Sequence, residues 1–115
     1  MGQKLDETTL IEVVESIHGL KIEIWGQDYQ HALERHPEVS LDRIRKTLQE
    51  PMRVIKSLSN NNVCLFYALE INDPEFGVIY FCVVVSVLGK GSGKLVTAYE
   101  TTYIKKGEPY VNKNQ

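Results

Sequence analysis

The first half of the chain contains apolar residues at helical spacing and one stretch at strand spacing. The helical spacing predicts an amphipathic helix over 6–18, which Gly19 ends. Apolar and polar residues then alternate over 20–25, which predicts a short strand. Two further helices are predicted over 27–36 and 40–50, and a proline follows each of them.

The second half is rich in Val, Ile, Phe and Tyr, residues that are typical of strands. The polar stretches SNNN, NDPEF and GKGSG separate the apolar runs and have the composition of turns. Short turns between successive strands favour antiparallel hairpins. The third run is apolar at both odd and even positions and is therefore expected to be a central strand. The four predicted strands are 52–58, 62–70, 77–88 and 94–104.

This order of elements predicts a compact α+β fold in which N-terminal helices pack on a four-stranded antiparallel β-meander. We find no internal repeat and no linker, and we expect one domain over residues 1–115 with its core at about 20–108. The tail from about Gly107, including 108–115, is expected to be loosely ordered.

The last predicted strand differs between its two faces. Alternation places Val96, Ala98 and Ile104 on one face, which we expect to be apolar. The other face would carry a row of four hydroxyl groups, those of Thr97, Tyr99, Thr101 and Tyr103.

The net charge of −2 conceals an asymmetry between the two parts of the chain. Residues 1–42 contain nine acidic and three basic residues, whereas residues 43–115 contain ten basic and six acidic residues. A basic face able to meet phosphate is therefore compatible with the sequence, although binding of nucleic acid through bulk charge alone is not. The apolar runs are too short to span a bilayer and no signal peptide is evident, so a cytoplasmic protein without membrane contact is expected.

Two motifs have simple structural explanations. Cys64 and Cys82 lie in separate apolar runs without Cys-x-x-Cys spacing, which predicts buried free thiols. The stretch GKGSGK is glycine-rich like a phosphate-binding loop, but Leu88 stands at the first glycine position and a strand follows. We therefore predict a hairpin turn here.

The stretch HALERHPEVS, residues 31–40, contains two histidines and an arginine at a helix end. Zinc-binding helices place two histidines four residues apart, whereas His31 and His36 are five apart. This spacing argues against a metal site, and no cofactor is expected.

General acid–base chemistry fits the same residues better. His31 and Arg35 are four apart on one helix face, and Pro37 directs His36 out of the helix. Cleavage of RNA at its own 2′-hydroxyl needs a base, an acid and cations, which histidine and arginine can supply. The hydroxyl row and the following lysines could complete the site; among them Thr101, Lys105 and Lys106 are candidates for substrate binding.

The residues alone leave a second interpretation open. Basic residues near a helix C-terminus stabilise the helix through its dipole, and alternating Thr and Tyr are typical of an exposed strand face. Neither feature requires a function.

Five stretches together resemble the small phage and bacterial nuclease-like domains of the barnase–EndoU–colicin–RelE superfamily. The resemblance covers about residues 20–108, and its most specific parts are RHPE before a proline-terminated helix and TAY on the final strand. The five stretches are HALERHPEV, LDRIRKTLQEPMRVI, FYAL, IYFCVVVSV and VTAYETTYIKKGE.

The resemblance implies helices packed on a four-stranded antiparallel sheet and RNA cleavage without a metal, by a toxin or a processing enzyme. RNA would be the substrate, and a protein antitoxin or immunity protein is a candidate partner. The alternative is a non-catalytic relative that binds RNA or a protein. We expect Thr97 and Tyr99 to share a cleft with a histidine. By similarity, the catalytic residues would be His31, Arg35, His36, Thr97 and Tyr99.

Overall fold

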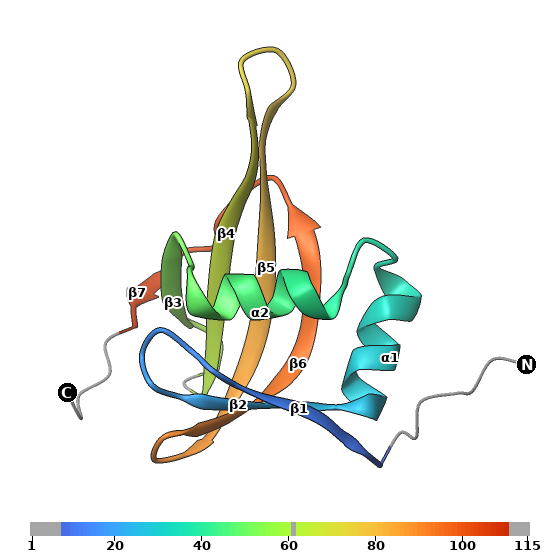
Figure 1. The fold of residues 1–115 in the computed structure, drawn as a ribbon. Helices are drawn as coiled ribbons and strands as arrows, with labels where there is room; N and C mark the ends of the chain where they lie inside the picture. The colour runs from blue at the N-terminus through green and yellow to red at the C-terminus, as the bar shows by residue number, and fades with distance from the viewer. Residues whose placement is uncertain (1–7, 61, 111–115) are drawn as a thin grey trace, which may run out of the picture.

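The computed structural model describes residues 8–60 and 62–110 of the chain. These residues form one seven-stranded sheet and two short helices (Figure 1). The elements in chain order are β1 (Leu10–Glu15), β2 (Lys21–Trp25), α1 (Gly26–Arg35), α2 (Leu41–Gln49), β3 (Arg53–Ser57), β4 (Val63–Asp73), β5 (Gly77–Gly89), β6 (Ser92–Thr101) and β7 (Gly107–Pro109).

The sheet is mixed and has the strand order β1-β2-β6-β5-β4-β3-β7. β2 runs parallel to β6, and every other neighbouring pair is antiparallel. The predicted fold class, N-terminal helices on a four-stranded meander, is therefore wrong. The meander exists as β3–β6, but β2 and β1 extend it on one side and β7 extends it on the other. β5 is the central strand, as its apolar composition predicts.

The predicted helix over 6–18 is wrong in the part that the structure describes, since Leu10–Glu15 form the strand β1. Val14 is buried and Val13 is exposed, which is the alternation of a strand rather than a helix. Three of the six residues in β1 are β-branched, and Gly19, with φ of 81°, lets the chain turn back so that β1 pairs with β2. Pairing with β2 thus outweighs the helical spacing.

The predicted loose tail is wrong where it can be compared. Gly107–Pro109 pair with β3 as β7, and the Tyr110 N–H donates to the Val54 carbonyl at 3.0 Å. A Cβ at Gly107 would lie 2.4 Å from the Lys56 carbonyl oxygen, so this close pairing requires glycine. Residues 111–115 lie outside the described part of the chain.

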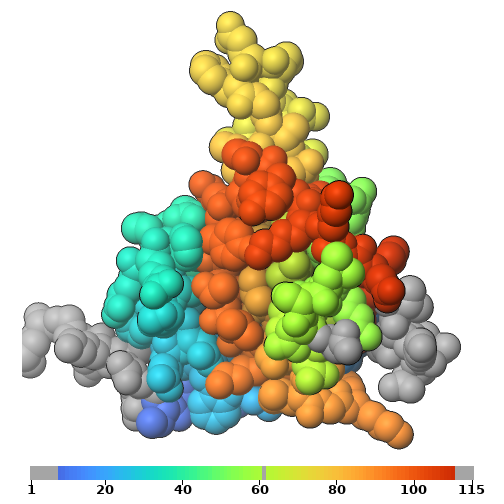
Figure 2. Space-filling view, turned by 180° about the vertical axis from the view of Figure 1, so that it is seen from behind, coloured from blue at the N-terminus to red at the C-terminus, as the bar shows by residue number. Residues whose placement is uncertain are grey.

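α2 lies across one side of the sheet, whereas α1 stands beside the edge of β6 (Figures 1 and 2). α2 crosses in front of β4 and β5, and its Ile44 and Leu48 are fully buried in the main core. The Ser40 hydroxyl caps α2 by accepting a hydrogen bond from the Arg43 N–H at 3.2 Å. α1 packs against β6, and in Figure 1 it stands higher in the view than the start of β6, where Ser92–Lys94 pair with β2. The opposite side of β3–β6 carries no helix (Figure 2). Within the described residues, neither helix is long and apolar enough to cross a membrane.

The β4–β5 hairpin projects well beyond the rest of the sheet (Figures 1 and 2). At its tip, one Asp73 carboxylate oxygen accepts hydrogen bonds from the N–H groups of Glu75 and Phe76 at 2.7 and 2.9 Å. These bonds fix the turn, and Gly77 closes it with a φ of 91°. The Phe76 side chain is nevertheless 86% exposed.

The two cysteines are free and buried, as predicted, and they point to opposite sides of the sheet. Burial raises the pKa of both Cys64 and Cys82 to about 11. Because the thiolate is the reactive form, we expect neither to react with a thiol reagent at pH 8 in the folded protein. Both should react quickly in denaturant. Rapid modification of one thiol without denaturant would show that the sheet opens locally.

Candidate functional site

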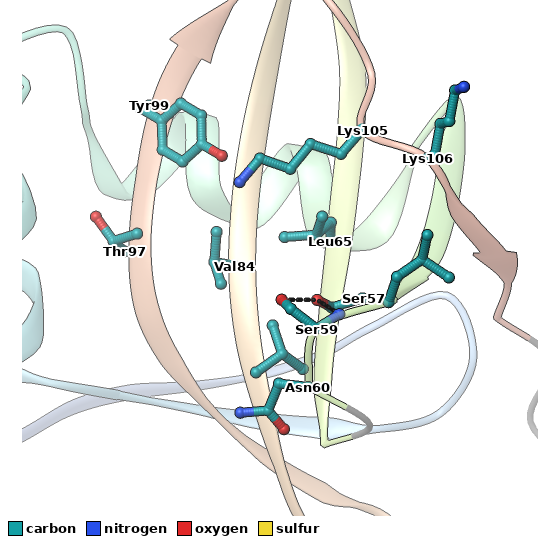
Figure 3. A pocket seen from close by; sticks show the side chains of 11 residues that line it. Ser57, Ser59, Asn60, Leu65, Val84, Thr97, Tyr99, Lys105 and Lys106 are labelled. Carbon is teal, nitrogen blue, oxygen red and sulfur yellow. Dashed lines mark hydrogen bonds between the residues drawn. The ribbon is translucent and has the colours of Figure 1, made fainter.

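A hollow of about 400 Å³ lies on the helix-free side of the sheet (Figure 3). Its floor is apolar and includes Val63, Leu65 and Val84. Thr97 and Tyr99 of β6 form one wall, and the loop after β3 forms the opposite wall. The remaining lining side chains are those of Ser57, Leu58, Ser59, Asn60, Lys105 and Lys106.

A β-bulge at Val96 sets which side chains of β6 enter this hollow. Leu95 pairs with Val85 and Thr97 pairs with Val84, so Val96 is the additional residue. Leu95 and Ala98 are consequently both buried under the helices, whereas Val96 is 42% exposed. The predicted apolar face of Val96, Ala98 and Ile104 is therefore wrong, and Ile104 instead packs beside Tyr99 on the helix-free side.

The lysines lie on the segment that follows β6 and crosses the helix-free side. The Lys105 N–H donates a hydrogen bond to the Tyr67 hydroxyl at 3.2 Å, which fixes the middle of this segment above β4. The Lys105 side chain extends from there toward the Tyr99 hydroxyl, whereas Lys106 points outward (Figure 3). The Lys105 ammonium and the Tyr99 hydroxyl thus lie close together above an apolar floor, whereas the Thr97 hydroxyl points away from them (Figure 3).

Tyr99 is a hydrogen-bond donor rather than a base. Burial is the largest cause, with the neighbouring Cys82 thiol second, of a pKa raised well above the usual value of 10.0. The phenol is therefore protonated near neutral pH and can donate to an anionic oxygen. Burial likewise raises the pKa of Tyr67 to about 12.

His36 ends helix α1 and contacts the wall of the hollow. Its backbone N–H donates to the Ala32 carbonyl at 2.8 Å, and its φ and ψ of −135° and 84° leave helical geometry, as expected before Pro37. The imidazole lies beside the Tyr99 ring, with 5.6 Å between the ring centroids. On its other side, Nδ1 lies 3.8 Å from a carboxylate oxygen of Glu38.

Glu38 belongs to a polar network that joins α1, α2 and the end of β6. Its carboxylate accepts a hydrogen bond from the Glu100 N–H at 3.1 Å. Arg43 donates to the Glu38 carbonyl and to the Glu100 carboxylate, each at 2.9 Å. The Arg43 guanidinium also lies 4.4 Å from the centroid of the Phe81 ring. This network holds Glu38 next to His36.

The sequence analysis did not identify Glu38, Arg43 or Glu100 as site residues. RHPE contains Glu38 only two residues after His36, and this spacing could have indicated a carboxylate partner. Arg43 and Glu100 are 57 residues apart, and their contact depends on how α2 crosses the sheet.

The structure brings together only some of the predicted site residues. Thr97, Tyr99, Lys105 and Lys106 line one hollow, and His36 contacts it through Tyr99. The side chains of His31 and Arg35 are exposed on α1. His31 lines a separate hollow with Gln27, Asp28, Gln30 and Glu34. Thr101 is at the end of β6, where its Oγ1 is 3.4 Å from the Tyr103 N–H that donates to it. Neither His31 nor His36 lines the hollow of Thr97 and Tyr99, and His36 is near it only through its contact with the Tyr99 ring.

The network makes stability sensitive to pH through Glu38. Partial burial alone would raise the pKa of Glu38, but backbone hydrogen bonds and the charges of His36 and Arg43 outweigh it, so the net pKa lies below 4.5. A lowered carboxylate pKa contributes stability above the unfolded pKa, and that contribution is lost as the pH falls through the folded pKa. We expect Glu38→Gln to be less stable than wild type at pH 7, with a difference that shrinks below about pH 4. Urea unfolding between pH 3 and pH 7 measures this. A difference that does not depend on pH would show that the Glu38 charge contributes nothing.

In the two stretches that the structure describes, no three His, Cys, Asp or Glu side chains lie close enough to hold a metal ion. A scan against models of protein families, a search of curated proteins and a search of solved structures each found no match.

Proposed function

We propose that this protein is an endoribonuclease that cleaves RNA by attack of a 2′-hydroxyl on the adjacent phosphodiester, without a metal ion. One observation carries the proposal. Thr97, Tyr99 and Lys105 line one hollow, and His36, whose Nδ1 lies 3.8 Å from a Glu38 carboxylate oxygen, contacts the Tyr99 ring. The resemblance of RHPE and TAY to the barnase–EndoU–colicin–RelE superfamily supports the same chemistry.

The roles follow from the chemistry of each group. His36 takes the proton from the 2′-hydroxyl as that oxygen attacks phosphorus. The bond from phosphorus to the 5′-oxygen breaks, and this oxygen takes a proton from the His36 imidazolium or from water. The Lys105 ammonium and the Tyr99 hydroxyl stabilise the charge on the phosphoryl oxygens. The products are a 2′,3′-cyclic phosphate and a 5′-hydroxyl end.

Incubation of the pure protein with transfer RNA, total RNA and ribosome-bound messenger RNA in EDTA tests the proposal. We expect fragments that end in a 2′,3′-cyclic phosphate. A Lys46→Ala variant, which removes a charge from an exposed position of helix α2, should cleave like wild type. Absence of cleavage above a His36→Ala control on all three substrates would contradict the proposed activity.

The second candidate function is a non-catalytic module that binds RNA or a protein. It is favoured by the exposed positions of His31 and Arg35 on α1, since among the described residues the hollow is lined by no histidine and no arginine and His36 contacts only the Tyr99 ring. High-yield expression without an antitoxin, together with RNA binding but no cleavage, would support this function over the nuclease.

A further inference from the structure

Side chains on the helix-free side of β3–β6 form rows that cross four strands in register. One row consists of Tyr99, Cys82, Tyr67 and Arg53, since each residue pairs with the next across neighbouring strands. Strands are roughly 4.8 Å apart, so Arg53 lies about 14 Å from Tyr99 along this row. The adjacent row consists of the apolar or uncharged residues Thr97, Val84, Leu65 and Ile55.

The lysine segment crosses these rows and separates two hollows. The first is the hollow of about 400 Å³ that contains Thr97 and Tyr99. The second, of about 530 Å³, is lined by Arg53, Ile55, Ile104, Gly107 and Pro109. Lys105 and Lys106 line both hollows. Figure 2 shows the segment, in the red-orange part of the colour range, lying across this side of the molecule.

The charge around the two hollows is of one sign. Among the residues that the structure describes, three cations and no carboxylate line them. Three cations elsewhere in the described residues form ion pairs: Arg43 with Glu70 and Glu100, Arg45 with Glu12 and Asp42, and Lys94 with Asp28. In the described stretches, no carboxylate lies within ion-pair distance of Arg53, Lys105 or Lys106. Within the described part of the chain, the two hollows therefore gather three unpaired cations and no carboxylate on one side of the sheet.

Unpaired cations above an apolar floor favour a ligand that has both anionic and apolar parts. A nucleotide chain has this composition, because its phosphates alternate with flat bases. The guanidinium of Arg53 matches two phosphate oxygens at once. The distance between Tyr99 and Arg53 exceeds the size of one phosphate group, so a phosphate bound at Tyr99 leaves Arg53 free to bind another phosphate.

We propose that Arg53 and the hollow around it form a second phosphate-binding subsite, which selects single-stranded RNA that crosses four strands from Tyr99 to Arg53. This proposal rests on the proposed function for the identity of the chain that binds. Single-stranded RNA can place its bases in separate hollows, whereas a duplex keeps them stacked inside.

Binding is measured with a fluorescein-labelled single-stranded RNA hexanucleotide and the His36→Ala protein, so that cleavage does not interfere. We expect Arg53→Ala in this background to weaken binding about tenfold, the usual size of a contact between an arginine and a phosphate. The slope of log K against log salt should become shallower by about 0.7, the value for one phosphate on a single strand. Lys46→Ala, which removes an equal charge from the helix α2, should change neither quantity.

Cleavage provides a second measurement. In wild type, kcat/KM should rise when a dinucleotide substrate is lengthened to a hexanucleotide, and Arg53→Ala should remove most of that gain. Arg53→Lys should bind the hexanucleotide more tightly than Arg53→Ala but less tightly than the protein with Arg53, because lysine restores the charge but not the two-point contact.

The outcomes separate the subsite from the activity. Cleavage with no effect of Arg53→Ala on either measurement would overturn the subsite and leave the nuclease. Binding that depends on Arg53 without any cleavage would support the subsite and overturn the nuclease. Equal or tighter binding of a duplex hexamer would overturn the preference for single strands, and absence of binding to either RNA at low salt would overturn both proposals.

Discussion

Replacement of His36 by alanine is expected to lower the RNA cleavage rate by roughly 10²–10⁴-fold, the usual contribution of a general acid or base. The imidazole contacts the Tyr99 ring and lies 3.8 Å from the Glu38 carboxylate, so its removal leaves no imidazole next to this wall of the hollow. The side chain is 36% exposed, and its backbone N–H bond to Ala32 does not depend on the imidazole. The melting temperature should therefore stay close to that of wild type.

His31 supplies a matched control on the same helix. It is exposed and lies at a different hollow, so we expect His31→Ala to change the rate only a few-fold. Arg35→Ala should also cost less than His36→Ala, because Arg35 is exposed and does not line the hollow. Single-turnover rates and thermal melts of the three variants measure this. A His36→Ala protein that cleaves normally but melts many degrees lower would show that His36 only holds the helix end.

Most of the elements could be predicted because local signals agree with tertiary packing. Ser40 caps α2, and its apolar stripe of Ile44 and Leu48 is buried as the spacing predicts. The turns between β4 and β5 and between β5 and β6 also lie where the stretches NDPEF and GKGSG predict them. β1 could not be predicted, because its apolar residues suit either period and only β2 decides between them.

The candidate site could be predicted only in part, for physical reasons. Alternation along β6 correctly places Thr97 and Tyr99 on one side, but the bulge at Val96 changes the side of every residue before it. Nothing in the sequence indicates that the segment after β6 turns across the sheet and brings Lys105 over Tyr67. Arg53 is similar: only the alignment of four strands places it in the row of Tyr99.

Replacement by alanine should have very different effects on the free energy of unfolding at Phe66, in β4, and at Phe76, in the turn after β4. Phe66 is fully buried, pairs with Val54 and Val83 on neighbouring strands, and lies in the main core with residues of α2. Phe66→Ala removes this packing and leaves a cavity, which costs about 3–5 kcal/mol. Because small domains are stable by about 5–15 kcal/mol, this variant should be close to unfolding at room temperature. Phe66→Leu keeps most of the volume and should cost less than about 1.5 kcal/mol.

Phe76 provides the control, since the same substitution is made where the ring is 86% exposed. We expect Phe76→Ala to change the free energy of unfolding by less than about 0.5 kcal/mol. Urea titrations followed by the fluorescence of Trp25, the only tryptophan, and by circular dichroism give both values. A loss at Phe76 as large as that at Phe66 would contradict the exposed position of the ring. If that loss grew with protein concentration, it would mean that the hairpin tip packs against another copy of the chain.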